Sequence, residues 1–195
     1  RHGAPLRAFR RAFEKGNVKI GFLGGSITAG EENVGGNADN WPSFLMGRLA
    51  EKYPQVLWES YNAGIGGTGS LSGAMRAERE VISTGCDLVF AEYAVNDWYE
   101  DKKTYRRARE GLVRKLLRAG ADVVFVYTFR TEMHADMAAG KLPWIIQETE
   151  TLARHYGIGS AWAGLHAYRA VCAGRLAWEQ WLPVAGGTLH PFAAG

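Results

Sequence analysis

The chain has 195 residues, of which 47% are hydrophobic and 22% charged, and its formal net charge is +3. This length and composition fit one ordinary globular domain, and no segment approaches the roughly 18 apolar residues of a membrane span. Basic residues cluster only at 102–118, where apolar residues interrupt them as on the solvated side of a helix. We therefore expect neither a nucleic-acid partner nor a membrane span.

The two cysteines, Cys86 and Cys172, form neither a disulfide framework nor a metal-binding motif. Cys86 opens an apolar run, so we expect it to be a buried thiol. The chain shows no signal peptide, but it begins at Arg1 rather than Met, which is consistent with a removed leader or with a fragment. Without a signal peptide or a disulfide pattern, a cytoplasmic location is favoured over a secreted one.

Strand-like runs recur along the chain, at residues 18–23, 56–61, 88–93, 123–129 and 157–162. Most of them are rich in apolar residues without clean alternation, which is typical of strands that are covered on both faces. The last run is the weakest. We see no internal repeat, low-complexity tract or linker, and expect a single domain over residues 1–195.

Helical patterns separate these runs. We expect the first helix to have Asn40 as its cap and Pro42 in its first turn, with one apolar face made of Trp41, Phe44, Leu45 and Leu49. The second has an apolar stripe that only Glu78 interrupts, made of Leu71, Ala74, Met75 and Ile82. Three more cover 105–119, 143–156 and 165–173. Strands and helices that alternate in this way predict a parallel sheet with helices on both faces, whose ligands bind beyond the carboxyl ends of the strands.

Chemically capable residues follow the predicted strands. The segments are "GGSITAG" after the first, "NAGIGGTGS" after the second, "AVNDW" after the third and "FRTEMH" after the fourth, with "GGTLHPFAAG" at the C-terminus. Together they supply a hydroxyl, glycine N–H groups, a side-chain amide and histidines. These are the components of acyl transfer, which needs a nucleophile, oxyanion donors and a base.

Each component also has a structural interpretation. Ser26 could cap a helix, Asn62 and the glycines after it could form a flexible turn, and Asn96 with Asp97 could be turn residues. His190 could be a surface histidine, and His134 a polar loop residue. A phosphate site is not supported, because "GGSITAG" lacks the lysine of a P-loop and the spacing of a dinucleotide fingerprint.

Taken together, the segments resemble the SGNH hydrolases, also called the GDSL esterase and lipase family. That family has a serine in G-[DG]-S-[IL]-T, a glycine in N-x-x-x-x-G, an asparagine in G-x-N-D and a histidine in D-x-x-H-P. Four blocks occur here in the same order: "GGSIT", "NAGIGG", "AVND" and "LHP", with Ala94 in place of the third block's glycine. The resemblance implies a three-layer, flavodoxin-like α/β fold with a five-stranded parallel sheet.

The resemblance assigns a role to four residues. Ser26 is the expected nucleophile, and its N–H is the first donor of the oxyanion hole. Gly67 supplies the second donor from its backbone, Asn96 supplies the third from its side chain, and His190 is the general base. No metal or cofactor is implied.

One part of the family's pattern is missing. The acid lies three residues before the histidine in the family, and that position here is Gly187, in a stretch without any carboxylate. A dyad, a backbone carbonyl or an acid from elsewhere could orient His190, and Asp97 and Glu132 are candidates by their position after strands. The family normally continues into a last helix, so the chain, which ends at Gly195, is expected to be truncated.

The sequence thus predicts an esterase that acts on small or carbohydrate O-acyl esters through an acyl-serine intermediate. Trp41, Trp98, Phe129 and His134 are candidates for lining the cleft, and stacking aromatic residues would favour a sugar. Two alternatives remain: a glycan-binding module of the same fold that has lost its activity, and an O-acyltransferase. The acyl group, the alcohol and the oligomeric state cannot be read from the sequence.

Overall fold

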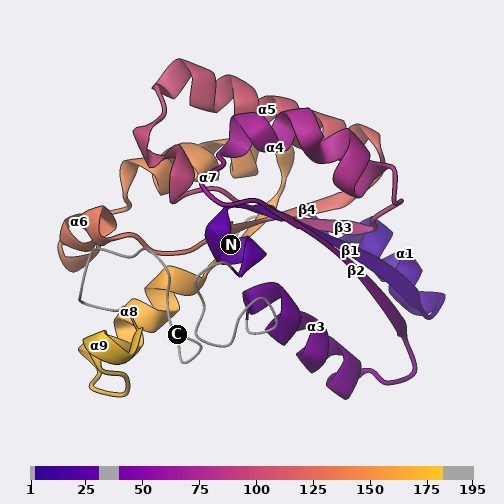
Figure 1. Cartoon of the computed structure of the whole chain (residues 1–195), viewed down its shortest axis with the longest axis horizontal. Helices are drawn as coiled ribbons and strands as arrows, with labels where there is room; N and C mark the ends of the chain where they lie inside the picture. Colours follow the sequence, from indigo (N-terminus) through magenta and orange to yellow (C-terminus); the bar gives the residue numbers. More distant parts are fainter. Residues whose placement is uncertain (1–2, 31–39, 182–195) are drawn as a thin grey trace.

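The computed structural model describes residues 3–30 and 40–181 of the chain. Five strands form one parallel sheet in the order β2-β1-β3-β4-β5. Four of them, β1 to β4, are labelled in Figure 1. The five strands are β1 (Asn17–Gly24), β2 (Leu57–Gly64), β3 (Leu88–Glu92), β4 (Asp122–Tyr127) and β5 (Gly159–Trp162). This is the order of flavodoxin-like sheets, so the predicted fold class is confirmed.

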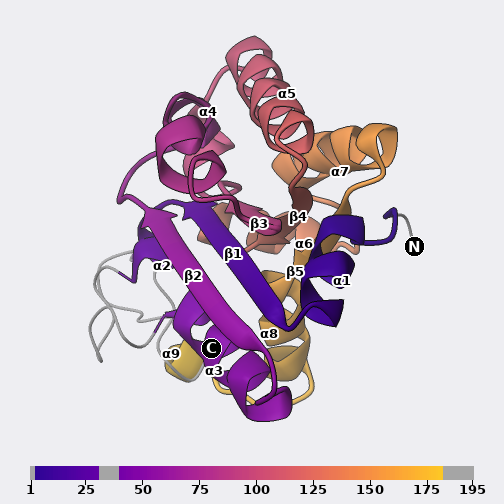
Figure 2. The same ribbon diagram turned by 90° about the vertical axis from the view of Figure 1, so that its right-hand side faces the viewer.

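Helices cover both faces of the sheet (Figures 1 and 2). One face carries α4 (Ser70–Ala77), α5 (Lys102–Arg118) and α7 (Trp144–Tyr156), and the other carries α1 (Arg7–Glu14), α3 (Trp41–Lys52) and α8 (Ala163–Cys172). Short elements fill the loops: α2 (Ser26–Ala29), a π-helical turn η2 (Glu78–Ile82), the 3₁₀ turns η3 (Asn96–Tyr99) and η4 (Thr131–Met133), α6 (His134–Ala138) and α9 (Trp178–Trp181). Within the described part of the chain, no helix is long and apolar enough to cross a membrane.

Helix α3 begins where its sequence signals predict. The side chain of Asn40 accepts a hydrogen bond from the Ser43 N–H at 2.9 Å, and Pro42 occupies the first turn. The predicted apolar face is wrong in one member, because Phe44 is 52% exposed. The helix packs on β2, an edge strand, so only a narrow stripe that includes Trp41 is covered.

The predicted apolar stripe of α4 and η2 is wrong in two members, whereas Ala74 and Ile82 pack partly buried against the core. Leu71 and Met75 are exposed, and the buried face consists of Ser70, Gly73 and Ala77. At Gly73 an added Cβ atom would come within 2.3 Å of the Tyr93 hydroxyl, so only a small residue permits this close approach. The buried face of α4 is therefore the face that carries small residues, and a search for large apolar residues in the sequence does not detect it.

Candidate active site

Ser26 lies at the carboxyl edge of the sheet, directly after β1. It is the first residue of α2, and Gly25, with φ −88° and ψ −153°, is the N-cap. The structural alternative of Ser26 as a helix cap is therefore not what the structure shows. The buried strand ends at Gly24, and the chain turns so that Ser26 is only partly buried.

The short turn that carries Ser26 is held by side chains from other elements, all of which meet Thr28. The Asn62 side chain donates to the Thr28 carbonyl at 2.8 Å, and the Trp41 indole donates to the Thr28 hydroxyl at 3.3 Å. That hydroxyl in turn donates to the carboxylate of Glu92 at 3.2 Å. Asn62, read from the sequence as a possible turn residue, thus ties the end of β2 to the turn of the candidate nucleophile.

Asn96 lies next to the serine's turn. A Cβ atom placed on Gly25 would come within 2.4 Å of the Asn96 side-chain oxygen and within 3.5 Å of the Thr68 carbonyl oxygen. The loops after β1, β2 and β3 therefore meet at Gly25. Gly67, in the second of these loops, has φ +68°, a left-handed conformation that favours glycine.

Asp97 is fully buried, and its carboxylate connects three parts of this edge. One oxygen accepts two hydrogen bonds from the Arg109 guanidinium at 3.0 and 3.1 Å, and the other accepts from the Ser70 N–H at 2.7 Å. The same oxygen is close to Gly69, where a Cβ atom would come within 2.4 Å of it. Asp97 thus fixes the loop of Asn96 against the start of α4.

Glu132, the other candidate acid, belongs to a separate cluster. Its carboxylate accepts from the Arg130 guanidinium and from the Tyr99 hydroxyl, the latter at 2.9 Å. The hydrogen bonds from Arg130 lower the pKa of Glu132 to about 2. His190 and Gly187 lie outside the described residues, so the partner of His190 stays a prediction.

The aromatic residues predicted for the cleft differ in their placement. Phe129 is buried against Trp181, and Trp41 packs edge-on against the rings of the core. Trp98 is partly buried against Trp144, and His134 is exposed, with its ring against Tyr168 and Trp178. Of this set only Phe129 is fully buried, whereas Trp41 and Trp98 are partly buried and His134 is exposed.

Glu92 was not singled out in the sequence. It ends β3, is 1% exposed, and accepts hydrogen bonds from the hydroxyls of Thr28 at 3.2 Å and Thr128 at 2.8 Å. Burial raises the pKa of Glu92 to about 6, and the two hydroxyl donors oppose the shift. The available signal was the acidic residue that closes the apolar run "LVFAE".

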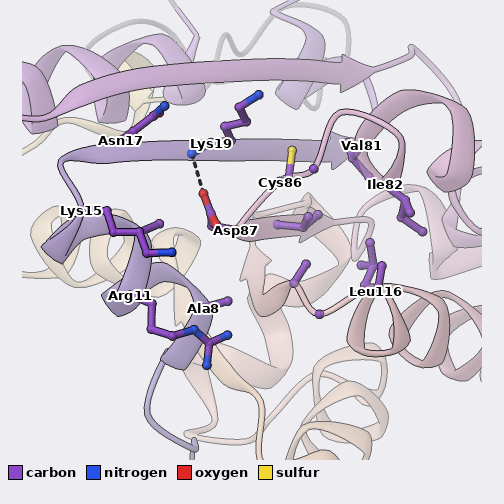
Figure 3. A pocket seen from close by; sticks show the side chains of 16 residues that line it. Ala8, Arg11, Lys15, Asn17, Lys19, Val81, Ile82, Cys86, Asp87 and Leu116 are labelled. Atoms are coloured by element: carbon purple, nitrogen blue, oxygen red, sulfur yellow. Dashed lines mark hydrogen bonds between the residues drawn. The ribbon is translucent and has the colours of Figure 1, made fainter.

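A cavity of about 410 Å³ lies at the opposite edge of the sheet (Figure 3). Arg11, Lys15 and Lys19 border it, and the Lys19 N–H donates to the carboxylate of Asp87 at 2.9 Å. Cys86 is buried there as predicted, and burial raises the pKa of its thiol. The three blocks that fall within the described residues lie at the carboxyl edge instead. Among the described residues, no three His, Cys, Asp or Glu side chains are grouped so that they could hold a metal ion.

Residues 22–195 match the model of the GDSL-like lipase/acylhydrolase family. The chain belongs to this family. The match begins inside β1 and includes every block that carries the resemblance, so the predicted family and its esterase class are confirmed at the level of the family. The search of curated proteins found no match.

Solved structures of similar fold include three esterases. A two-domain esterase active on acetylated mannans, co-crystallised with mannopentaose, is 28% identical with a TM-score of 0.81; the alignment covers 100% of this chain and 50% of that one. An acetylxylan esterase from Geobacillus stearothermophilus is 19% identical with a TM-score of 0.67, and the alignment covers 88% of this chain and 90% of that one. The acetyl xylan esterase AlAXEase is 20% identical with a TM-score of 0.71, and the alignment covers 91% of this chain and 93% of that one. The chain thus spans half the length of the two-domain esterase, and the other two show the fold alone.

Proposed function

We propose that this protein hydrolyses carboxylic esters through an acyl-serine intermediate on Ser26. The observation that carries the proposal is the meeting at Gly25 of the loops that hold three of the family's blocks, where Asn96 lies directly beside the residue that precedes Ser26. A side-chain amide in that place can donate to the oxygen on which negative charge develops during attack. By resemblance, Gly67 supplies a further donor and Ser26 its own N–H.

His190 is the proposed base, which takes the proton from Ser26 and returns it to the leaving alcohol. The contacts of Asp97 and Glu132 with Arg109 and Arg130 favour positioning roles for both carboxylates. We therefore propose that His190 works without a family-type acid. A Gly187→Asp variant should then gain part of the roughly 10⁴-fold in kcat that loss of the acid costs in the Ser-His-Asp template; an unchanged kcat would mean that another group already orients His190.

The proposed substrate class is O-acetylated carbohydrate. Support comes from the two-domain esterase active on acetylated mannans, which is 28% identical and similar over the whole of this chain. Acetylated manno- and xylo-oligosaccharides are the substrates to compare first.

The test is covalent capture of the nucleophile. A fluorophosphonate should phosphonylate one peptide, the one that contains Ser26, with loss of fluoride and the matching mass gain. The Ser26→Ala variant should neither react nor release acetate. Wild-type protein that leaves the probe unreacted would contradict the hydrolase assignment. If such a protein still bound acetylated oligosaccharides, the glycan-binding alternative would replace it.

A further inference from the structure

One exposed aromatic ring stands beside the proposed oxyanion hole. Tyr99 is the last residue of η3, and Asn96 is the first. A 3₁₀ helix has three residues per turn and rises about 2 Å per residue. Asn96 and Tyr99 therefore lie on the same side of η3, about 6 Å apart along its axis. A group bound at Tyr99 would therefore be a close neighbour of an ester bound at Asn96.

The ring of Tyr99 is held from behind. The Arg130 guanidinium lies 4.4 Å from the ring centroid, and its Nη2 donates to the Tyr99 hydroxyl at 2.6 Å. That hydroxyl donates to Glu132, which also binds Arg130. Arg130 is itself only 3% exposed and donates to the Val95 carbonyl at 2.7 Å, so the support is anchored in the loop after β3.

Despite these contacts, Tyr99 is 77% exposed. One face is covered by the guanidinium, and much of the rest of the ring is open to solvent. An aromatic ring that is fixed before binding loses little conformational entropy when a ligand covers it. Its neighbours are polar: the Glu132 side chain is 38% exposed, and Glu100 follows at the surface.

We propose that Tyr99 is a stacking platform for a sugar ring of the substrate, on the alcohol side of the ester. The negative face of the aromatic ring attracts the weakly positive C–H groups on one face of a pyranose, and the polar rim suits its hydroxyls. A simple acyl chain has no hydroxyl groups that could form hydrogen bonds with these polar neighbours. This inference rests on the proposed function and extends it, because it assigns recognition of the sugar to a residue outside the family's blocks.

The test compares two esters of the same acid, an O-acetylated manno-oligosaccharide and ethyl acetate, whose alcohol has no ring. In Tyr99→Ala, the ratio of kcat/KM for the oligosaccharide to kcat/KM for ethyl acetate should fall about tenfold, mainly through KM. Tyr99→Phe keeps the face and loses the hydroxyl contacts, so its ratio should fall less. Leu57→Ala, which truncates another exposed apolar side chain at the far edge of the sheet, should keep the wild-type ratio.

A ratio unchanged in Tyr99→Ala would overturn the platform, and so would an equal loss on both esters, because the ring would then support the machinery rather than the sugar. Binding separates this inference from the proposed function. Mannopentaose is titrated into Ser26→Ala and into the double variant with Tyr99→Ala. About tenfold weaker binding in the double variant supports the platform even if no ester is turned over. Equal affinity, or no binding to either protein, rejects it.

Discussion

The side-chain oxygen of Asn96 lies so close to Gly25 that a Cβ atom at position 25 would come within 2.4 Å of it. Gly25 has φ −88°, which any residue can adopt, so the backbone itself does not require glycine there. The requirement is for space beside the amide. The residue before the serine and the residue that supplies the amide therefore constrain each other directly.

Gly25→Ala should lower kcat by displacing Asn96, at most by the 10²–10³-fold that loss of one oxyanion donor costs. The measurement is steady-state hydrolysis of ethyl acetate. Gly47→Ala is the matched control, because an added Cβ atom there has nothing within 4 Å. If Gly25→Ala acts through the amide, its effect should largely vanish in an Asn96→Ala background; additive losses would point to another cause.

Asn96→Ala should lower kcat by about 10²–10³-fold and change KM little, because the amide binds charge that develops only in the transition state. Both constants come from initial rates over a range of ester concentrations. Asn17→Ala, at the exposed start of β1, serves as the control. An Asn96→Ala enzyme with wild-type kcat would make Asn96 a turn residue only.

Arg109→Met should destabilise the fold by about 3–5 kcal/mol, because it leaves the fully buried carboxylate of Asp97 without its cation. Urea denaturation followed by circular dichroism gives the free energy of unfolding. Arg106→Met, three residues away on α5, removes an exposed bridge to Glu148 and should cost less than about 1 kcal/mol.

Should Arg109→Met fail to fold, the double variant Arg109→Met with Asp97→Asn keeps the prediction testable, since it removes the buried charge and should recover part of the loss. Equal unfolding free energies for Arg109→Met and Arg106→Met would contradict the importance of the buried pair.

Glu92→Gln should change how stability depends on pH. The pKa of Glu92 is about 6 in the folded protein and near its ordinary value of 4.5 when unfolded, so between these values the folded state holds more protons. Its contribution is therefore present below pH 4.5 and is lost as the pH rises through 6. From pH 4.5 to 7 the wild type should lose about 2 kcal/mol relative to Glu92→Gln.

The measurement is urea denaturation of both proteins at a series of pH values. Glu51→Gln, at a side chain that is 69% exposed, should follow the wild-type curve. If the curves of wild type and Glu92→Gln ran parallel, the buried carboxyl would not titrate in this range.

Local signals were enough to predict most elements of the fold. The strand ends lie within two residues of the predicted runs, except at the end of β2, which continues to Gly64. The cap at Asn40 is also confirmed. Both predictions depend on neighbouring residues in the sequence. The faces of α3 and α4 were harder. In α4, Met75 is exposed, whereas Gly73 is buried against the ring of Tyr93. That packing depends on the residue after β3, which is distant in the sequence.

The residues of the candidate site were predicted from motifs, but the side-chain contacts that hold these residues in place were not predicted. Ser26, Gly67 and Asn96 stand in short recognisable blocks. The hydrogen bond from Thr28 to Glu92 has no local pattern, since it depends on which strands become neighbours. The pairing of Asp97 with Arg109 depends on how α5 packs against the turn that precedes it. Nor does the sequence distinguish Tyr99 from other surface tyrosines, because its support comes from Arg130 on the next loop.

The strand order also has a consequence for folding kinetics. β1 lies between β2 and β3, so pairing it with either strand brings together residues that are far apart in the sequence. The hydrogen bond from Thr28 to Glu92, for example, joins residues 64 positions apart. Contacts of this separation lose loop-closure entropy before they gain packing energy, and such topologies fold slowly. During synthesis the turn of Ser26 therefore emerges early and acquires its support from Glu92 only after β3 has left the ribosome. A helical protein of this length, with mainly local contacts, has no comparable delay.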